Sequence, residues 1–176
     1  GNIPDLMTIA KGLTSGYIPM GGLIVSDKVF DVIKTAGDFN HGFTYSGHPV
    51  AAAVALENIR ILREEKILEQ VREQTAPYLQ ARLRELNDHP LVGEVRGVGM
   101  LGAIELVKDK ATRARYEGKA VGMICRAHCF NNGLIMRAVG DTMIIAPPLV
   151  ISKAEIDELV TKARLCLDLT LKDLQG

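Results

Sequence analysis

Apolar and polar positions divide the chain into three stretches of different build. The first holds two short apolar runs, residues 6–10 and 22–26, which are rich in β-forming residues and predict two short buried strands. The polar, glycine-containing residues 13–19 between them predict a loop. Ser26 and Asp27 stand directly before a run with helical spacing, so we expect a capped helix to begin there.

The middle stretch carries the longest helical pattern. Pro49 follows a cluster of cap-forming residues and suits the first position of a helix. Apolar residues then recur at helical spacing as far as Leu86, with charges on the opposite face. Pro77 predicts a break or kink. The tetrapeptide at residues 87–90, Asn-Asp-His-Pro, predicts the end of this helix.

The last stretch alternates between segments with the two-residue spacing of strands and segments with helical spacing. The expected elements are a strand pair over 92–107, a helix over 119–130, strands at 133–137 and 142–146, and a closing helix. Ser152 begins that last helix, and Glu155 three residues later predicts a capping box. This order predicts a small α+β domain with an antiparallel sheet covered by helices on one side.

Composition and charge argue against nucleic acid and anionic membranes as binding partners. The 176 residues are 47% hydrophobic and 24% charged, with 21 basic and 21 acidic residues. This balance offers neither nucleic acid nor an anionic membrane a basic surface. The longest apolar runs are far shorter than the roughly 20 residues of a membrane span. Three cysteines cannot all pair, so we expect a reduced, cytoplasmic protein.

Lys11 is the first candidate for chemistry. It follows an apolar strand and precedes glycine, and partial burial there would lower the pKa of its amine and make it nucleophilic toward a carbonyl. The alternative is a lysine that simply leaves the sheet into water. Local composition alone leaves both possibilities open.

Two further segments suit anions. Residues 41–49, HGFTYSGHP, place hydroxyls, glycines and imidazoles at the mouth of a helix, where free N–H groups favour a phosphate. Arg137 is the charge on an otherwise apolar strand, and its planar guanidinium matches a carboxylate. The alternatives are a polar loop with an ordinary helix cap and a strand-end arginine in solvent.

Two other patterns are expected to be structural. Residues 97–102 have the glycine spacing of a dinucleotide-binding loop, but a strand pattern follows where that motif needs a helix. We therefore expect a turn between strands. Cys125, His128 and Cys129 share one helical face, yet no fourth metal ligand lies nearby in sequence, so core cysteines are expected.

Taken together, the motifs resemble a known enzyme family. Residues 4–22, PDLMTIAKGLTSGYIPMGG, closely resemble the cofactor-lysine segment of class III (omega) aminotransferases, which use pyridoxal 5'-phosphate. Residues 41–49 and 95–100 are similar to the same family in the same order. The resemblance covers essentially the whole chain and is strongest to the amine and polyamine:pyruvate branch.

The resemblance implies a fold and a domain division. The chain would be an α/β protein, the C-terminal portion of a fold type I pyridoxal-phosphate-dependent transferase. Residues 1–70 would be the end of the large cofactor-binding domain, including the lysine segment and the long connecting helix. Residues 71–176 would be the small α+β domain.

The resemblance also implies roles for four residues. Lys11 would form a Schiff base with the cofactor and move protons. Thr44, with the backbone around Phe43, would hold the cofactor phosphate at the active site of a partner subunit, which implies a homodimer or tetramer. Arg137 would bind the substrate carboxylate. The family's aspartate for the pyridine nitrogen, its stacking aromatic residue and its other phosphate ligands lie upstream and cannot be located in this sequence.

The implied reaction transfers an amino group from an amine, such as a diamine, polyamine or ω-amino acid, to a keto acid such as pyruvate. Within the family, an aminomutase or an acyl-amino-acid transaminase would use the same Lys11. A different alternative is that this chain by itself is a non-catalytic α/β fragment or interaction module.

Overall fold

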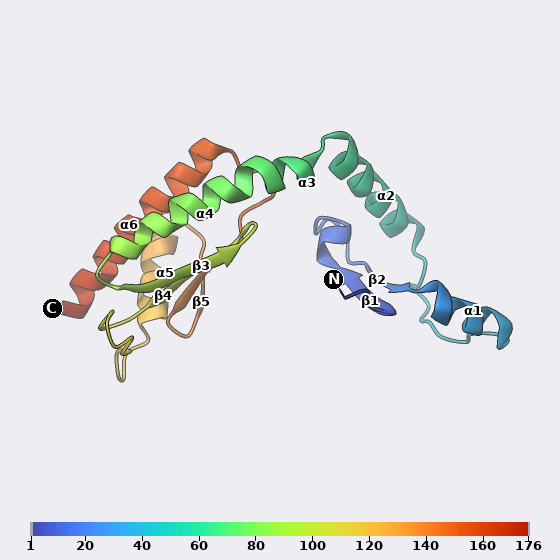
Figure 1. The fold of residues 1–176 in the computed structure, drawn as a ribbon, viewed down its shortest axis with the longest axis horizontal. Helices are drawn as coiled ribbons and strands as arrows, with labels where there is room; N and C mark the ends of the chain where they lie inside the picture. The colour runs from blue at the N-terminus through green and yellow to red at the C-terminus, as the bar shows by residue number, and fades with distance from the viewer. Residues whose placement is uncertain (1, 176) are drawn as a thin grey trace. The chain divides into compact units, whose positions relative to one another are not determined.

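The computed structural model describes residues 2–175, which fall into two units, Gly1–Lys66 and Ile67–Gly176. Figure 1 shows the elements of each unit along the chain. The first unit contains β1 (Leu6–Ala10), a 3₁₀ turn (Lys11–Leu13), β2 (Gly21–Val25), α1 (Asp27–Thr35) and α2 (Pro49–Glu64). The assignment of residues 1–70 to the end of a large cofactor-binding domain and of residues 71–176 to a small α+β domain stays a prediction.

The strands of the first unit form where expected, but their predicted burial is wrong. β1 and β2 pair antiparallel, from Leu6 opposite Val25 to Ala10 opposite Gly21. Leu6 and Ile24 are 54% and 49% exposed. An apolar run shows that a strand is suited to burial, and no element within residues 2–66 covers this pair.

The residue before α1 also behaves differently from the prediction. The helix begins at Asp27 as expected, yet Ser26 makes no side-chain cap. Its hydroxyl donates instead to Asp5 Oδ1 at 3.0 Å, and its N–H donates to the Asp5 carbonyl at 2.9 Å. Ser26 therefore ties the end of β2 to the start of β1.

The long helical pattern is interrupted earlier than Pro77. α2 starts with Pro49 at its first position, as predicted, but the chain leaves the helix at Lys66, whose φ is +51°. α3 (Ile67–Gln70), a π-helical turn (Val71–Thr75), α4 (Ala76–Arg84) and a 3₁₀ turn (Glu85–Asp88) follow. Pro77 lies in the first turn of α4, directly after the π-helical turn. Because proline lacks the N–H of a regular α-helical bond, this change of helix type agrees with the break or kink predicted at Pro77.

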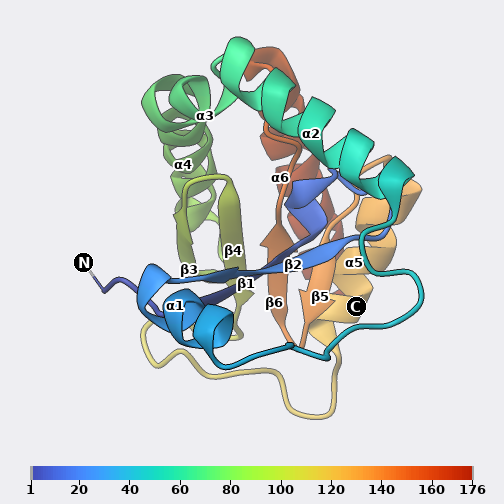
Figure 2. The same ribbon diagram turned by 90° about the vertical axis from the view of Figure 1, so that its right-hand side faces the viewer.

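The second unit has the predicted α+β build. Its antiparallel sheet has the order β3 (Val92–Val98), β4 (Leu101–Leu106), β6 (Thr142–Ile145), β5 (Arg137–Val139). α4, α5 (Val121–Asn131) and α6 (Lys153–Gln175) lie on one face of this sheet, as Figures 1 and 2 show. The strand expected at 133–137 was placed too early, because β5 only begins at Arg137.

The core of the second unit lies between these helices and the sheet. Leu79 and Leu83 of α4, Ile104 of β4, Met143 of β6 and Ile156 of α6 are fully buried in it. Their side chains face one another because apolar positions repeat every two residues on the strands and at helical spacing on the helices. Burial of this set provides the main stabilisation of the unit.

The predicted capping box at the start of α6 is confirmed. The N–H and hydroxyl of Ser152 both donate to Glu155 Oε2 at 2.7 Å, and the Glu155 N–H donates back to the Ser152 hydroxyl at 3.2 Å. These bonds satisfy amides that the helix itself leaves unpaired. None of the helices described for residues 2–175 is long and apolar enough to cross a membrane.

Candidate active site

β1 leads directly into the turn that carries Lys11. Lys11 has a φ of +54°, in the left-handed region, and the following residues make a 3₁₀ turn in which the Thr14 N–H donates to the Lys11 carbonyl at 3.2 Å. Thr14 is buried, and its hydroxyl donates to the Ile18 carbonyl at 2.7 Å. Lys11 is therefore held on a defined turn, which its position after an apolar strand did not predict. The residue is exposed, so the partial burial considered for it is not found.

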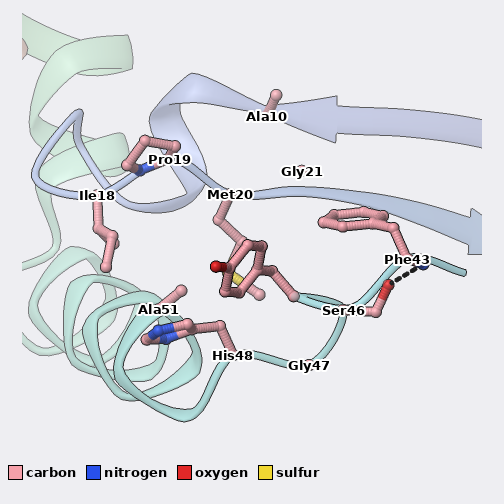
Figure 3. A pocket seen from close by; sticks show the side chains of 11 residues that line it. Ala10, Ile18, Pro19, Met20, Gly21, Phe43, Ser46, Gly47, His48 and Ala51 are labelled. Atoms are coloured by element: carbon pink, nitrogen blue, oxygen red, sulfur yellow. Dashed lines mark hydrogen bonds between the residues drawn. The ribbon is translucent and has the colours of Figure 1, made fainter.

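A pocket of about 740 Å³ lies within the first unit, beside the ends of β1 and β2. It is lined by Ala10, Ile18, Pro19, Met20, Gly21, Phe43, Tyr45, Ser46, Gly47, His48 and Ala51. Figure 3 shows that these side chains come from the two strand ends, from the loop before α2 and from its first turn. Segments that are well separated in sequence therefore meet around one space.

The pocket brings two of the predicted segments together. Ala10, directly before Lys11, and Phe43, directly before Thr44, both line it. Lys11 and Thr44 are themselves outside the lining set. The structure thus places the lysine turn and the predicted phosphate loop at the border of the same pocket, while the roles of Lys11, Phe43 and Thr44 stay predictions.

In the loop before α2, the backbone N–H of Phe43 is hydrogen-bonded, whereas that of Thr44 has no partner among the described residues. The Phe43 N–H donates to Ser46 Oγ at 3.1 Å, and the Ser46 N–H donates to the Phe43 carbonyl at 2.9 Å (Figure 3 draws the first of these). Within residues 2–175, neither the N–H nor the hydroxyl of Thr44 has a hydrogen-bond partner. Thr44 is therefore the donor that an anion could use without breaking a contact.

The start of α2 adds further donors. His48 occupies the cap position and makes no side-chain hydrogen bond to the helix, and Pro49 is the first helical residue. The N–H groups of the first turn are consequently not satisfied by a cap, and an uncapped helix start attracts anions. The hydroxyl and N–H of Thr44 and the uncapped amides of α2 are hydrogen-bond donors that suit a phosphate.

Arg137 lies in the second unit, at the first position of β5, where it is exposed. Its direct neighbour across the sheet is Ile144, and the row continues through Ala103 to Arg96. Directly paired residues point to the same face of a sheet, and the neighbouring positions, such as Met143, are buried under the helices. Arg137 therefore lies on the open face.

Arg137 differs from the other arginines near that face. Glu105 accepts from Arg96 at 2.9 Å and from Arg115 at 3.3 Å. These hydrogen bonds, first that of Arg96, hold the pKa of Glu105 below its usual value. Among residues 2–175, the structure shows no ion pair or hydrogen bond for the Arg137 guanidinium, so it can bind an external carboxylate.

The glycine motif at residues 97–102 is a hairpin turn, as expected. β4 rather than a helix follows it, and Gln80 of α4 donates to the carbonyls of Gly99 and Leu101 at 3.0 and 3.1 Å. A Cβ atom at Gly97 or Gly102 would overlap α4 side chains. The glycines are needed because the helix packs directly on the hairpin.

The cysteines are core residues, as expected. Cys125, Cys129 and Cys166 are free and fully buried. A hydrogen bond with Cys125 together with burial raises the pKa of Cys129, and burial raises that of Cys166. No group of three metal-ligating side chains occurs among residues 2–175. His128 instead contacts Asp173 Oδ2 through Nε2 at 2.7 Å.

Comparison with known proteins decides the family. The family described as aminotransferase class-III matches residues 1–167. The chain belongs to the class-III aminotransferase family. The predicted resemblance is thereby confirmed.

Curated members of the class-III aminotransferase family are similar over nearly the whole chain. A putrescine–pyruvate aminotransferase of Pseudomonas aeruginosa is 72% identical over 170 residues, which is 97% of this chain and 37% of that protein. Gamma aminobutyrate transaminase 1 of Solanum lycopersicum, a mitochondrial protein, is 43% identical over 89% of this chain and 31% of its own length. The chain thus spans about a third of the length of these relatives.

Solved transaminase structures have the same fold over this region. One, from work on directed evolution of transaminases by ancestral reconstruction, has a TM-score of 0.91 at 47% identity and covers 97% of this chain and 39% of its own. The PMP-bound form of an aminotransferase from Vibrio fluvialis has a TM-score of 0.90 at 35% identity, with the same two coverages. The prediction of an α/β chain that forms part of a transaminase fold is confirmed.

One polar side chain at the lysine turn was missed by the sequence analysis. Asn58 of α2 donates to the carbonyls of Gly12 and Leu13. It lies 46 residues from Gly12, and no local spacing pattern links them. Its neighbours on α2 are ordinary helix residues, so only the folded structure reveals the contact.

Proposed function

We propose that the protein to which this chain contributes is a pyridoxal-phosphate-dependent aminotransferase that moves an amino group from an amine to a keto acid such as pyruvate. The observation that carries this proposal is the 72% identity, over 97% of the chain, to a putrescine–pyruvate aminotransferase. The proposed amino donor is a diamine or polyamine. The similarity to gamma aminobutyrate transaminases supports ω-amino acids as a related donor class.

The residues of the first unit fit pyridoxal phosphate by their donor chemistry. Lys11 supplies an amine, and Thr44 supplies an N–H and a hydroxyl that no described residue uses. The uncapped start of α2 adds positive potential. When bound, the cofactor supplies an aldehyde that condenses with amines and a ring that withdraws electrons. The PMP-bound form of the Vibrio fluvialis aminotransferase supports this assignment.

Lys11 would act first as a covalent anchor and then as a base. Lys11 Nζ would be the group that holds the bound cofactor covalently and that the substrate amine would displace. The displaced Lys11 amine would then accept the proton from the substrate carbon that bears nitrogen and would act as the acid when that proton is returned. Both roles require that the Lys11 backbone hold Nζ in a constant direction.

Phe43 and Thr44 would hold the cofactor phosphate, with Thr44 as the main donor. We propose that this loop serves the site of a second subunit and that the protein is a homodimer or a tetramer. Arg137 would bind the carboxylate of the keto acid through two parallel N–H groups. A diamine donor carries no carboxylate and would leave Arg137 unused.

Reductive trapping tests the proposal on the full-length protein. After pyridoxal phosphate is added and the protein is reduced with borohydride, peptide mass spectrometry should find the pyridoxyl label on Lys11. Lys11→Ala should lose the label and reduce putrescine–pyruvate turnover by about 10²- to 10⁴-fold or more, as expected for loss of an acid–base group. Lys34→Ala on α1 is the matched control and should keep both. Turnover by Lys11→Ala within about tenfold of the parent protein would refute the mechanism.

A further inference from the structure

The turn that carries Lys11 has an unfavourable backbone. Lys11 and Ser15 both have left-handed φ angles, +54° and +48°, without being glycine. Residues other than glycine adopt this conformation only where surrounding contacts compensate for its cost. The contacts that hold this turn are therefore the ones that keep Lys11 in place.

Asn58 makes three of these contacts. Its Nδ2 donates to the Gly12 carbonyl at 2.9 Å and to the Leu13 carbonyl at 3.1 Å. Its Oδ1 accepts from the Ser15 hydroxyl at 2.6 Å. One side chain thereby joins the two residues after Lys11 to the second left-handed residue of the same turn.

The three contacts require an amide. Both N–H groups of the Asn58 side chain point at carbonyl oxygens, which can only accept, so the orientation of the amide is determined by its partners. An aspartate of the same shape would place one carboxylate oxygen against the two carbonyl oxygens, which are all acceptors, and would keep only the contact with the Ser15 hydroxyl. An alanine would leave both carbonyls without these donors.

Asn58 makes these contacts from a well-formed helix, α2. Ala51 and Ala55 are buried along the helix, and Arg60 bonds to Glu57 at 2.6 Å and also pairs with Glu64 on the exposed side. Asn58 is therefore held by a formed helix rather than by a loop. The same helix begins directly after the loop that contains Thr44, so a single element contacts the lysine turn and adjoins the predicted phosphate loop.

We propose that Asn58 is a positioning residue for Lys11: it fixes the turn so that the amine approaches the cofactor from one direction. This rests on the proposed function. Proton transfer needs the two heavy atoms at about 2.6–3.2 Å, and a misplacement of about 1 Å can cost roughly 100-fold in rate. Asn58 itself touches neither substrate nor cofactor in this role.

The test uses the full-length holoenzyme and four variants. Asn58→Ala removes all three contacts, Asn58→Asp keeps the shape but loses the donors, and Ser15→Ala removes one contact. Arg63→Gln, at an exposed position of α2, leaves the turn untouched and is the control. Three quantities are measured: the borohydride label on Lys11, kcat and KM for the amine, and the apparent pKa of the lysine-bound cofactor from its absorbance.

We expect all four variants to retain the label on Lys11. Asn58→Ala and Asn58→Asp should lower kcat by about 10- to 100-fold with KM changed less than threefold, and should shift the apparent pKa of the lysine-bound cofactor. Ser15→Ala should show a smaller loss in the same direction. Arg63→Gln should match the parent protein.

Two results would overturn the proposal. If Asn58→Ala and Asn58→Asp keep kcat within twofold and leave the cofactor pKa unchanged, Asn58 has only a structural role. Should Asn58→Ala fail to fold, unchanged values in Asn58→Asp and Ser15→Ala would show the same structural role. Absence of the label on Lys11 in the parent protein would refute the proposed function as well, and it would be seen before any variant is made.

Discussion

Lys11 and Arg137 are two basic residues in different structural settings. Lys11 stands on a left-handed turn that several hydrogen bonds hold. Arg137 begins a three-residue strand and points from the open face of its sheet. Both residues are exposed. A lysine on a fixed backbone suits covalent chemistry, whereas an arginine without a partner among residues 2–175 suits a carboxylate that binds and dissociates.

The role proposed for Arg137 predicts that its loss slows the half-reaction with the keto acid more than the half-reaction with the amine. Arg137→Ala should lower kcat/KM for pyruvate by about 10- to 100-fold, because a charge-assisted hydrogen bond is worth about 1.5–3 kcal/mol. The half-reaction with putrescine, which carries no carboxylate, should change less than threefold. Stopped-flow measurement of both half-reactions checks this, with Arg96→Ala as control. Equal losses in the two half-reactions would show that Arg137 is structural.

At the level of elements, α4 packs directly on the hairpin of β3 and β4. Gln80 bonds to the hairpin carbonyls, and Leu83 fills the space that a side chain at Gly102 would need. The glycines of this motif are thus explained by helix packing. The motif that resembled a phosphate-binding loop serves stability instead.

This packing predicts that Gly102→Ala destabilises the second unit. The added methyl group would meet Leu83 Cδ1, and overpacking of this kind costs about 1–3 kcal/mol. Leu83→Val removes the atom that is met, so the double variant should lose less than the sum of the two single variants. Urea unfolding of the four proteins measures the coupling. Strict additivity would contradict direct contact.

At the scale of the whole second unit, His89 connects distant parts of the chain. The Leu91 N–H donates to Nδ1 at 3.1 Å, which leaves Nε2–H to donate to Asp168 of α6 at 3.2 Å. The imidazole is 2% exposed. Burial lowers the pKa of His89 below 6.5, and the hydrogen bond with Asp168 opposes this only in part. The neutral ring is therefore the form that the folded state prefers.

This arrangement predicts an acid-sensitive stability. Because the folded pKa lies below the unfolded value of 6.5, the unfolded chain takes up the proton first. Stability is therefore full above about pH 7.5 and falls as the pH drops through 6.5 toward the folded pKa. Asp168, Arg164 and Asp88 are the charged groups that act on the ring, and Lys110 bonds to the His89 carbonyl.

Urea unfolding at pH 7.5 and 5.5 measures the effect. His89→Asn should show a smaller drop in unfolding free energy between these two pH values than the parent protein. Asp168→Asn should show a larger drop, because it removes the contact that raises the pKa of His89. An identical drop in all three proteins would show that His89 does not carry the acid sensitivity.

The sequence alone determined the features that depend on neighbours along the chain. Helical spacing, the proline at the start of α2, the Ser152–Glu155 capping box and the strand pair around Gly97 all depend on residues a few positions apart. Local sterics and local hydrogen bonds are sufficient to specify such elements. The resemblance of residues 4–22 to the class-III aminotransferases is also a property of the linear sequence.

Only the tertiary structure decided the features that depend on distant partners. The left-handed turn at Lys11, its three contacts with Asn58, and the exposure of β1 and β2 follow from which elements meet, and no spacing rule encodes this. The same holds for the position of Arg137 on the open face, which the register with β6 sets. Long-range contacts join residues whose separation along the chain follows no fixed spacing. These features therefore form only in the folded structure and cannot be predicted from local sequence patterns.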